Sequence, residues 1–515
     1  METELKLLIA PADVATFRRL ALLKQFATGK PVTRLLRHTY FDTPDRSLKD
    51  HGMELRVRRV GRVSIQTLKA AGQAAAAGLH MRQEWETHVD GPLPELGLLV
   101  ALVGAGSTSG KVLSAPRVAT GLAPIFGSEI RRTVWNLRLA QGAEVELALD
   151  LGELKHDDRR EPISEVEIEL KNGAAQALFD LALQLQEHVP LRVGNRSKAE
   201  RGYALQAPVA VAAMKARPVA LRAEMSVEAG FQAIVSNCVA HMQNNEIGVA
   251  QGADSESIHQ MRVGMRRLRS ALRLFAPWIP FPPSLKQELG WLATELGAAR
   301  DADVLADGTL PKTIKACPQE ADLLTLRQVV STLADKQRRQ AAAAVASARH
   351  SRLMLRLVGW LHTSHWRESF DETTLGKLTE PLPRQATRIL ARRHEKLVEL
   401  GRRLTQASPE QRHQVRIAAK KARYATEFFQ SLYRDRRVKR YISGLAALQD
   451  GLGWLNDAAV ADRLLREIGA LHQEVAPGAS FARGYLCATM KQDLPGLNRL
   501  WEKFESTETP WMHRK

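Results

Sequence analysis

Up to about residue 204, charged and apolar residues alternate along short segments that turn residues separate. A period of two is typical of a β-strand, because successive side chains point to opposite faces. The first segment places Glu2, Glu4 and Lys6 on one face and an apolar row on the other. After a predicted helix over 11–29, seven further strand-like segments begin at Arg34, Glu54, Arg62, Arg82, Arg131, Glu144 and Glu165.

A charged face on a single strand is typical of a half-exposed antiparallel sheet, and any one of these strands fits that interpretation. Its recurrence on nearly every strand favours strands that close or stack to bury their apolar faces. A barrel can keep a charged lumen while helices and loops cover its outer face. Grouped carboxylates suit a divalent cation, and grouped Arg and Lys suit phosphate oxygens. The pattern therefore predicts a site for a metal-bound polyphosphate.

Beyond residue 222 the period changes to that of helices. A helix predicted from Ser257 to Phe275 has an apolar seam and a separate basic stripe. The seam consists of Met261, Met265, Leu268, Leu272 and Phe275, and the stripe of His259, Arg262, Arg266, Arg269 and Arg273. A charge stripe is usually a solvated face, so one copy alone would decide nothing.

The stripe occurs twice. His413, Arg416, Lys420 and Arg423 repeat the first copy 154 residues later, and Asp301 and Asp457 lie in a second repeated segment with an offset of 156. Two motifs that recur at nearly the same offset predict a duplicated helical bundle, in which the two stripes meet in one groove.

Charge and composition narrow the classes of partner. The chain has 515 residues and a net charge of +18. Residues 1–200 carry 27 Lys and Arg against 25 Asp and Glu, whereas the remainder carries 47 against 31. The excess in the C-terminal part predicts a polyanionic partner there. No apolar run predicts a membrane span, no signal peptide is apparent, and three dispersed cysteines suit a reducing cytoplasm.

The N-terminal part resembles CYTH domains, the triphosphate tunnel metalloenzymes. The ExExK signature is present as Glu2-x-Glu4-x-Lys6, and Arg82-x-Glu84-x-Glu86 and Glu165-x-Glu167-x-Glu169 follow in the family's order. The resemblance covers roughly residues 1–204 and implies an eight-stranded antiparallel β-barrel tunnel with flanking helices. It also implies hydrolysis of inorganic triphosphate, or of short polyphosphate, with Mg²⁺ or Mn²⁺.

Site residues follow from this resemblance. The metal ligands it implies are Glu2, Glu4, Asp150, Glu165 and Glu167. The triphosphate clamp it implies consists of Lys6, Arg56, Arg58, Lys69, Arg82, Arg132 and Lys198. Catalytic roles are expected for Lys69 and for Glu165, Glu167 and Glu169, one of which would orient the attacking water. Which of them does so stays open.

The C-terminal part resembles the CHAD domain, a conserved-histidine α-helical domain, over about residues 223–505. The resemblance is with the bacterial proteins that join a CYTH and a CHAD domain as inorganic triphosphatases. It implies binding of inorganic polyphosphate by His259, Arg262, Arg266, Arg269, His413, Arg416, Lys420 and Arg423. A capping or packing role for each histidine stays open.

The expected organisation is a multidomain α+β chain. Residues 1–204 would form the tunnel, 205–222 a connection, 223–505 an all-α duplicated bundle with a repeat of about 155 residues, and 506–515 a tail. We expect a cytoplasmic location and, within the cytoplasm, association with polyphosphate granules. One apparent phosphate loop, at Gly104 to Lys111, lacks the required spacing and is predicted to be a flexible surface loop.

Two other functions are compatible with the sequence. The chain could be a non-catalytic polyphosphate-binding adaptor, or its barrel could act on nucleoside or thiamine triphosphate or as a class IV-type adenylate cyclase. The intact set of inward acids argues against an inactive barrel, and the basic C-terminal part favours a phosphate chain over a nucleotide. Nucleic acid also carries a phosphate backbone, but few aromatic residues lie along the basic stripes.

Overall fold

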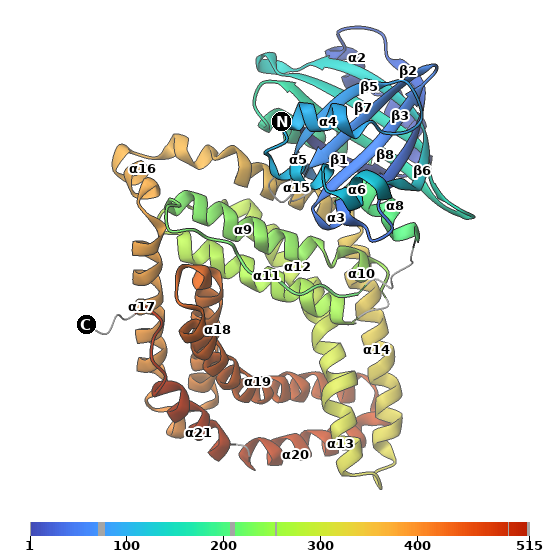
Figure 1. Ribbon diagram of the computed structural model, residues 1–515. Helices are drawn as coiled ribbons and strands as arrows, with labels where there is room; N and C mark the ends of the chain where they lie inside the picture. The colour runs from blue at the N-terminus through green and yellow to red at the C-terminus, as the bar shows by residue number, and fades with distance from the viewer. Residues whose placement is uncertain (1, 71–77, 207–211, 253–254, 493, 512–515) are drawn as a thin grey trace. The chain divides into compact units, whose positions relative to one another are not determined.

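The structure is a computed structural model that describes residues 2–70, 78–206, 212–252, 255–492 and 494–511. Its contacts divide the chain into two compact units (Figure 1). The first comprises residues 1–212 together with 346–363, and the second comprises 213–345 together with 364–515.

The first unit is built on a closed antiparallel barrel of eight strands, as predicted. The strands are β1 (Glu2–Ile9), β2 (Val32–Asp42), β3 (Met53–Val60), β4 (Val63–Ala70), β5 (Leu79–Val89), β6 (Ala123–Arg138), β7 (Glu144–His156) and β8 (Arg159–Asn172). Strand β1 closes the barrel by pairing with β8 on one side and β5 on the other. A short strand, β9 (Leu191–Val193), pairs with the end of β1.

The charged and apolar faces lie as the alternation predicts. Leu5 and Leu7 of β1 are fully buried, whereas Glu2 and Glu4 on the other face line a cavity inside the barrel. The outer face is covered by helices, including α7 (Gln176–Gln186), whose Phe179 is buried. Helix α15 (Ala348–Thr363) belongs to this unit because it packs on α7 and β9.

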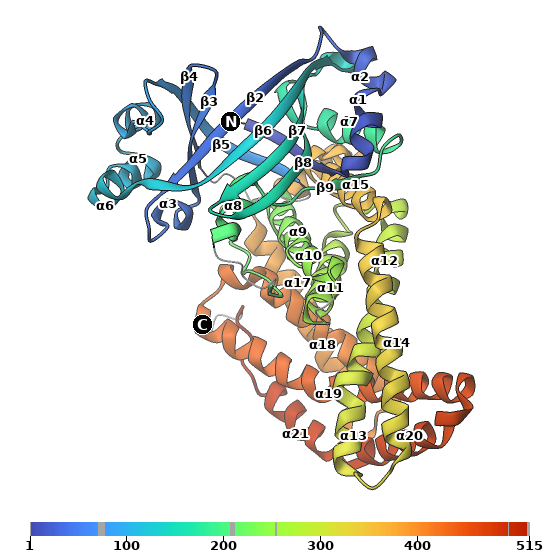
Figure 2. The same cartoon turned by 90° about the vertical axis from the view of Figure 1, so that its right-hand side faces the viewer.

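The remaining helices of the first unit are short. Pro11–Asp13 is a 3₁₀ turn, followed by α1 (Val14–Arg18) and α2 (Ala21–Phe26), so the single helix predicted over 11–29 is interrupted near Leu20. Helices α3 (Ser47–Asp50), α4 (Leu96–Val103), α5 (Thr108–Leu113) and α6 (Pro116–Gly121) gather beside β3 to β5 (Figure 2).

One prediction in this region is wrong. Residues 104–111 are expected to form a flexible surface loop, but 108–111 lie in helix α5, whose N-terminus is capped by the Ser107 hydroxyl. The buried Gly110 approaches the backbone of Gly104 so closely that a Cβ would overlap it.

The last helix before the second unit is α8 (Lys198–Gln206). It packs on β6, β7 and β8. Gly202 allows this close approach, because a Cβ there would overlap the ring of Phe126 on β6. Tyr203 is buried beside the same ring.

The second unit is helical. Its longer helices are α9 (Val227–Gln243), α11 (Ser255–Phe275), α12 (Pro283–Asp303), α14 (Asp322–Val345), α17 (Leu382–Gly401), α18 (Pro409–Phe429), α19 (Asp435–Leu471), α20 (Ala476–Gln492) and α21 (Leu494–Glu505). Shorter ones are α10 (Glu246–Ala250), α13 (Leu310–Ala316) and α16 (Glu372–Thr379), and a π-helical segment spans Val304–Thr309.

The two helices that carry the basic stripes have the predicted seams. In α11 all five seam residues are buried, with Met261, Leu268 and Phe275 fully so. In α18 the matching residues Val415, Ala419, Ala422 and Phe429 are also buried. Helix α11 packs against α12 and α18 against α19, and α11 and α18 contact each other. This pairing brings the polar faces of both copies into one region.

Candidate functional site

The barrel encloses a cavity of about 330 Å³. Apart from Tyr40, Ala148, Ser197 and Ala199, every described residue that lines it is charged. The acids are Glu2, Glu4, Glu54, Glu84, Glu86, Glu146, Glu167 and Glu169, and the cations are Lys6, Arg56, Arg58, Lys69, Arg82, Arg132, Lys171 and Lys198. The predicted charged lumen is therefore present, with eight groups of each sign among the described residues.

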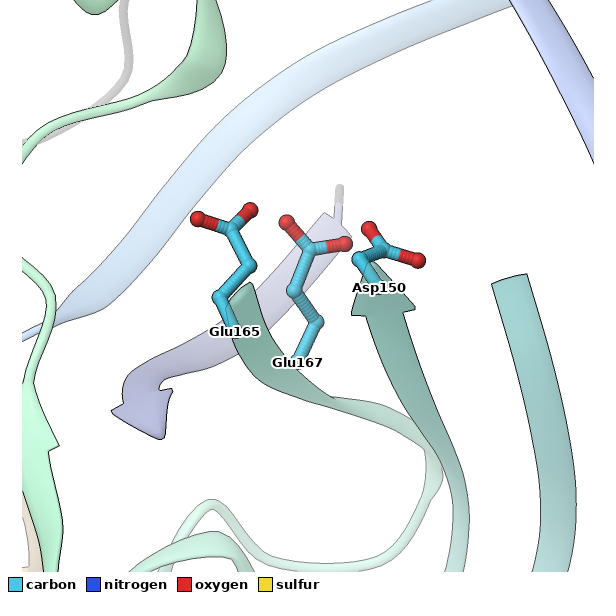
Figure 3. Close-up of side chains that lie close together, drawn as sticks. All are labelled: Asp150, Glu165 and Glu167. Carbon is cyan, nitrogen blue, oxygen red and sulfur yellow. The ribbon is translucent and has the colours of Figure 1, made fainter. Parts of the chain in front are cut away.

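Three buried carboxylates lie together at one wall of the cavity. Asp150 comes from β7 and Glu165 and Glu167 from β8, and Figure 3 shows their carboxyl groups side by side. One oxygen of each lies within 4.8 Å of the others. Glu167 lines the cavity, whereas Asp150 and Glu165 have no exposed surface and lie behind it. The three are called the triad below.

Cations neutralise the triad. Lys198 Nζ lies 2.7 Å from Asp150 and 2.8 Å from Glu167 and also pairs with Glu165. Lys6 Nζ lies 3.1 Å from Glu165 and pairs with Glu167 as well. Burial by itself would raise the pKa of the Glu167 carboxyl, but Lys198, Lys6 and Arg132 hold that pKa well below its usual range.

Arg132 completes this network from β6. Its Nε and one Nη donate to the two oxygens of Asp150 at 2.7 and 2.6 Å, and the same Nη contacts Glu167. Such a two-pronged pair is strong and fixes the plane of the guanidinium. The triad is therefore an ionised, fully paired cluster in this structure.

Helix α8 supplies two cations that contact the triad, Lys198 and Arg201. Lys198 lies in its first turn, and Arg201 donates from Nη1 to Glu165 at 3.0 Å and from Nε to Glu161 at 2.6 Å. The helix is held by Tyr203, whose hydroxyl donates to Asp42 Oδ2 at 2.6 Å. Asp42, fully buried, also accepts from the backbone N–H groups of Leu48 and Lys49.

A second group of carboxylates is not neutralised in this way. The register places Glu4 of β1 opposite Glu169 of β8, and Glu169 opposite Glu146 of β7. Like charges directly opposite each other on neighbouring strands destabilise a sheet. Within the described parts of the chain, Glu4 and Glu146 form no ion pair. These three residues are called the acidic row.

Two carboxyl groups in this part of the lumen have raised pKa values, although Glu169 pairs with Lys171 and Glu2 with Lys69. Burial raises the pKa of Glu169, and Glu2 and Glu146 raise it further against the opposing effect of Lys171. Burial also raises the pKa of Glu2, although Lys69 Nζ lies only 2.6 Å from its carboxylate. Both shifts have the direction expected for carboxylates that crowd together out of water.

The opposite part of the lumen has cations with unused donors. Among the described residues, the Nε atoms of Arg56 and Arg58 are buried without a hydrogen-bond partner. Burial and the neighbouring Arg56 lower the pKa of the Arg58 guanidinium. Their Nη2 atoms lie 3.9 Å from Glu84 and 3.4 Å from Glu86, respectively, so the unused donors are the Nε atoms. Two neighbouring guanidinium groups with buried, unused donors are chemically suited to an anion with several oxygens.

All the tunnel residues singled out from the sequence come together here, but not equivalently. Asp150 and Glu165 lie behind the lining, and the others line the cavity. Glu54 and Glu146 were not predicted as site residues, although both share the alternation phase of their strands. His80 was missed too, and its buried Nε2 has no partner among the described residues. Arg201 was not predicted as a site residue either, because its contact with Glu165 depends on how α8 docks.

The second unit contains a groove of about 870 Å³. Residues of both basic stripes line it, namely His259, Arg262 and Arg266 from α11 and Arg416, Lys420 and Arg423 from α18. Arg269 and His413 are exposed and are not among the described residues that line the groove. The other cations of the lining are Lys215, Arg217, Arg267, Arg300 and Lys312.

The two equivalent arginines contact the matching segments of the two copies, but through residues at different positions. Arg262 donates to Gly297 O at 2.6 Å and to Asp301 Oδ1 at 3.4 Å. Arg416, its counterpart, donates to Asn456 Oδ1 at 2.9 Å. In the described part of the chain, the buried Nε atoms of Arg266 and Arg416 have no hydrogen-bond partner. The groove thus resembles the lumen in keeping cationic donors unused.

Crowding of like charges shows in the pKa values of the groove. Burial lowers the pKa of Lys420 to about 7, with Arg416 and Arg266 adding to the shift. Burial lowers the pKa of His259 to about 4, again with help from a neighbouring arginine, Arg300. His259 is therefore neutral at pH 7 and can offer an anion only an ordinary N–H donor.

The fold and the two sites define a class: a closed barrel with a charged lumen, followed in the chain by a helical bundle with a basic groove. The model of the CYTH domain matches residues 1–203, and that of the CHAD domain matches residues 233–466. The chain belongs to the family of proteins that carry a CYTH domain followed by a CHAD domain.

Two relatives document the match. The structure of the CHAD domain from the plant Ricinus communis is 38% identical, covers 59% of this chain and 99% of that chain, and has a TM-score of 0.54. A protein of Haemophilus influenzae named inorganic triphosphatase is 32% identical over 205 residues, which are 40% of this chain and 54% of that protein. This chain thus spans about half the length of that relative. None of the described helices is long and apolar enough to cross a bilayer.

Proposed function

We propose that the barrel hydrolyses inorganic triphosphate with the help of Mg²⁺ or Mn²⁺, and that the groove of the second unit binds inorganic polyphosphate. One observation carries the enzymatic part: among the described residues, one enclosed lumen contains both unused guanidinium donors and the carboxylates of Glu4 and Glu146, which form no ion pair. Such a lumen complements a metal-bound chain of phosphates in both signs of charge. The name of the Haemophilus influenzae relative supports the same substrate.

The phosphate chain would be bound by the cations of the lining. Arg56 and Arg58 offer their free Nε donors, and Lys69 lies between the acids Glu2 and Glu84, at 2.6 and 3.5 Å. Arg82 donates to Glu54 at 2.7 Å, which fixes its guanidinium toward the lumen. Several fixed cations around one anion stabilise the charge that moves onto the leaving phosphate, without reorganisation during the reaction.

The acidic row fits a divalent cation better than the triad does. Three carboxylates of adjacent strands face one another in the row, and Glu2 lies two residues from Glu4 on β1. We therefore expect Glu2, Glu4, Glu146 and Glu169 to hold the ion, since hard cations prefer carboxylate oxygens. When bound, the ion would neutralise phosphate oxygens and make a water molecule more acidic.

The triad then has a different role. Its carboxylates are already paired with two lysines and Arg132, so we expect Asp150 and Glu165 to fix those cations at the lumen. Among the carboxylates expected to orient water, Glu169 is the best placed, because it lines the cavity and burial raises its pKa.

The lining favours an inorganic substrate over a nucleotide. Tyr40, Ala148 and Ala199 are its only uncharged residues other than Ser197, within the described chain, and they form no apolar pocket for a base. Tyr40 stacks on Phe126 at 4.4 Å, so one face of its ring is already covered. Nucleoside and thiamine triphosphatase or cyclase activities would need a binding surface for a ring.

Replacement of Glu4 by Gln tests the enzymatic proposal. We expect release of phosphate from inorganic triphosphate to fall at least a hundredfold, because the acidic row loses one of its three charges. Phosphate release would be measured with and without Mg²⁺ on triphosphate, ATP and thiamine triphosphate. Glu153→Gln, which removes an exposed acid of β7, is the matched control. Metal-independent turnover, or an active Glu4→Gln protein, would contradict the proposal.

For the groove, the carrying observation is that two basic helices with orphaned guanidinium donors line one cavity. Phosphate oxygens are the natural acceptors for such donors. Tyr424 and Trp454 also line the groove, which leaves stacking on single-stranded nucleic acid as the second candidate. Competition between inorganic polyphosphate and an oligonucleotide of equal charge would decide between the two. If the barrel shows no turnover and the groove binds, the chain is the polyphosphate adaptor considered above.

A further inference from the structure

The groove has a wall that is not a helix. Residues 214–221, called the strap below, precede α9 and have no regular secondary structure. Val219 and Leu221 of the strap are buried, whereas Lys215 and Arg217 are exposed and line the groove. The strap lies between the residues matched by the two family models, which end at 203 and begin at 233.

Side chains of the bundle hold the strap at three points. Asn245, almost fully buried, accepts from Met214 N and donates to Met214 O, both at 2.9 Å. Asn237 Nδ2 donates to Arg217 O at 3.1 Å. Ser431 Oγ accepts from Leu221 N at 2.9 Å and donates to Leu221 O at 3.1 Å. The backbone is thus fixed on both sides of Lys215 and Arg217.

This fixation leaves two cations free beside the groove. In the described part of the chain neither Lys215 nor Arg217 forms an ion pair or a side-chain hydrogen bond. Two other cations of the groove are offset by acids, since Arg262 pairs with Asp301 and Arg423 with Glu427. A cation on a pre-positioned backbone binds an anion at less entropic cost than one on a free chain.

We propose that the strap is one wall of the polyanion site, and that Lys215 and Arg217 contact phosphate oxygens of a chain bound between α11 and α18. This inference rests on the proposed function of the groove. It assigns part of the binding to residues outside the helical motifs. It also means that an occupied groove covers the strap.

Binding measurements on the full chain test these two cations. Lys215→Ala combined with Arg217→Ala should weaken binding of long-chain inorganic polyphosphate about tenfold. The slope of log affinity against log salt should fall by about 2, because each of the two replaced side chains would bind one phosphate. Lys286→Ala combined with Arg327→Ala removes the same charge from exposed positions outside the groove lining and should change affinity less than twofold.

Limited proteolysis tests whether the strap is covered. Trypsin can cut after Lys215, whereas Pro218 blocks cleavage after Arg217. Saturating polyphosphate should slow cleavage of the Lys215–Ala216 bond at least tenfold, measured by mass spectrometry. Bonds cut elsewhere in the same chain correct for any effect of polyphosphate on trypsin. A chain in which Arg262, Arg266, Arg416 and Lys420 are all Ala should lose this protection.

The outcomes separate the two hypotheses. If the wild-type chain does not bind polyphosphate, both the proposed function of the groove and the proposed role of the strap are overturned. If it binds, but the strap variant matches its charge control and the Lys215–Ala216 bond is cut as fast as in the free protein, only the strap is overturned. Weaker binding of the strap variant together with protection of this bond supports it.

Discussion

Lys420 shows how one residue can make anion binding depend on pH. Its ammonium group is surrounded by Arg416, Arg266 and Arg262, with Asp457 as the opposing acid, and burial lowers its pKa to about 7. At pH 8, Lys420 is therefore neutral in most molecules whose groove is free. A bound phosphate chain adds negative charge beside Lys420 and raises its pKa again.

The sign of the pH effect follows from this linkage. Binding favours the protonated lysine, so affinity is greatest below pH 7 and falls as pH rises from 7 toward the higher pKa of the complex. Because binding is linked to the uptake of one proton, the affinity can fall at most tenfold for each pH unit. Titration calorimetry with long-chain polyphosphate at pH 6.5 and 8.5, in buffers of different ionisation enthalpy, would show proton uptake. Lys420→Arg keeps its charge, so its affinity should be nearly constant over this range, and a wild-type affinity that is equally constant would contradict the prediction.

At this scale the sequence predicts which residues meet, but not their state of charge. Alternation is sufficient to place Glu4, Glu167 and Glu169 in one lumen, because the period of a strand determines which face each side chain occupies. It cannot tell that Lys198 and Arg132 neutralise Glu167 while Glu4 stays unpaired among the described residues. That difference depends on where α8 docks and on the register of three strands.

Among the elements, α8 has the largest effect on the lumen. It is the only helix of the described chain that lines the cavity, through Lys198 and Ala199. Its position depends on Gly202 against Phe126 and on the hydrogen bond from Tyr203 to Asp42. The resemblance to CYTH domains implies a phosphate-binding residue at Lys198, but not that a helix carries it.

Tyr203→Phe tests this role of α8. Loss of a hydrogen bond to a buried carboxylate costs about 1.5–3 kcal/mol. We expect the amides of α8 to exchange hydrogen faster and the KM for triphosphate to rise, because Lys198 and Arg201 would be less well held. Hydrogen exchange followed by mass spectrometry and steady-state kinetics would measure the two effects. Tyr433→Phe removes a hydroxyl that contacts Thr387 in the second unit and should leave both unchanged. Normal exchange in α8 of the Tyr203→Phe protein would refute this role.

Elements without a clear period are where prediction from the sequence ends. The helix at 108–113 buries Leu113 in a cluster with Leu55 and Leu68 of the barrel, a contact that local pattern does not contain. The π-helical segment at Val304–Thr309 is a similar case, because the matching part of the second copy lies inside the uninterrupted helix α19. The apolar seams of α11 and α18, by contrast, follow directly from their spacing.

For the whole molecule, the separate location of the two sites predicts independent loss of function. The lumen belongs entirely to the first unit and the groove to the second. Glu4→Gln should therefore bind polyphosphate within twofold of the wild-type affinity. The chain with Arg262, Arg266, Arg416 and Lys420 replaced by Ala should bind it at least a hundredfold more weakly and still hydrolyse triphosphate at a rate within twofold of wild type.

Both activities would be measured on both proteins, so that each serves as the control for the other. If loss of the groove abolished hydrolysis of triphosphate in a folded protein, the two sites could not be independent. The net charge asymmetry of the sequence predicts this division of partners, because the excess of cations lies beyond residue 200.

The pairing of β1 with β8 has a consequence for synthesis of the protein. Glu4 faces Glu169, so β1 completes its pairing with β8 only after about residue 172 has been synthesised. Contacts between residues so far apart in sequence form slowly, because a long loop must close first. The tunnel is therefore assembled in one late step. A chain that stops before β8 lacks Glu165, Glu167 and Glu169 together. It also leaves β1, which would pair only with β5, with one open edge prone to aggregation. Incomplete translation should thus yield no partly active barrel.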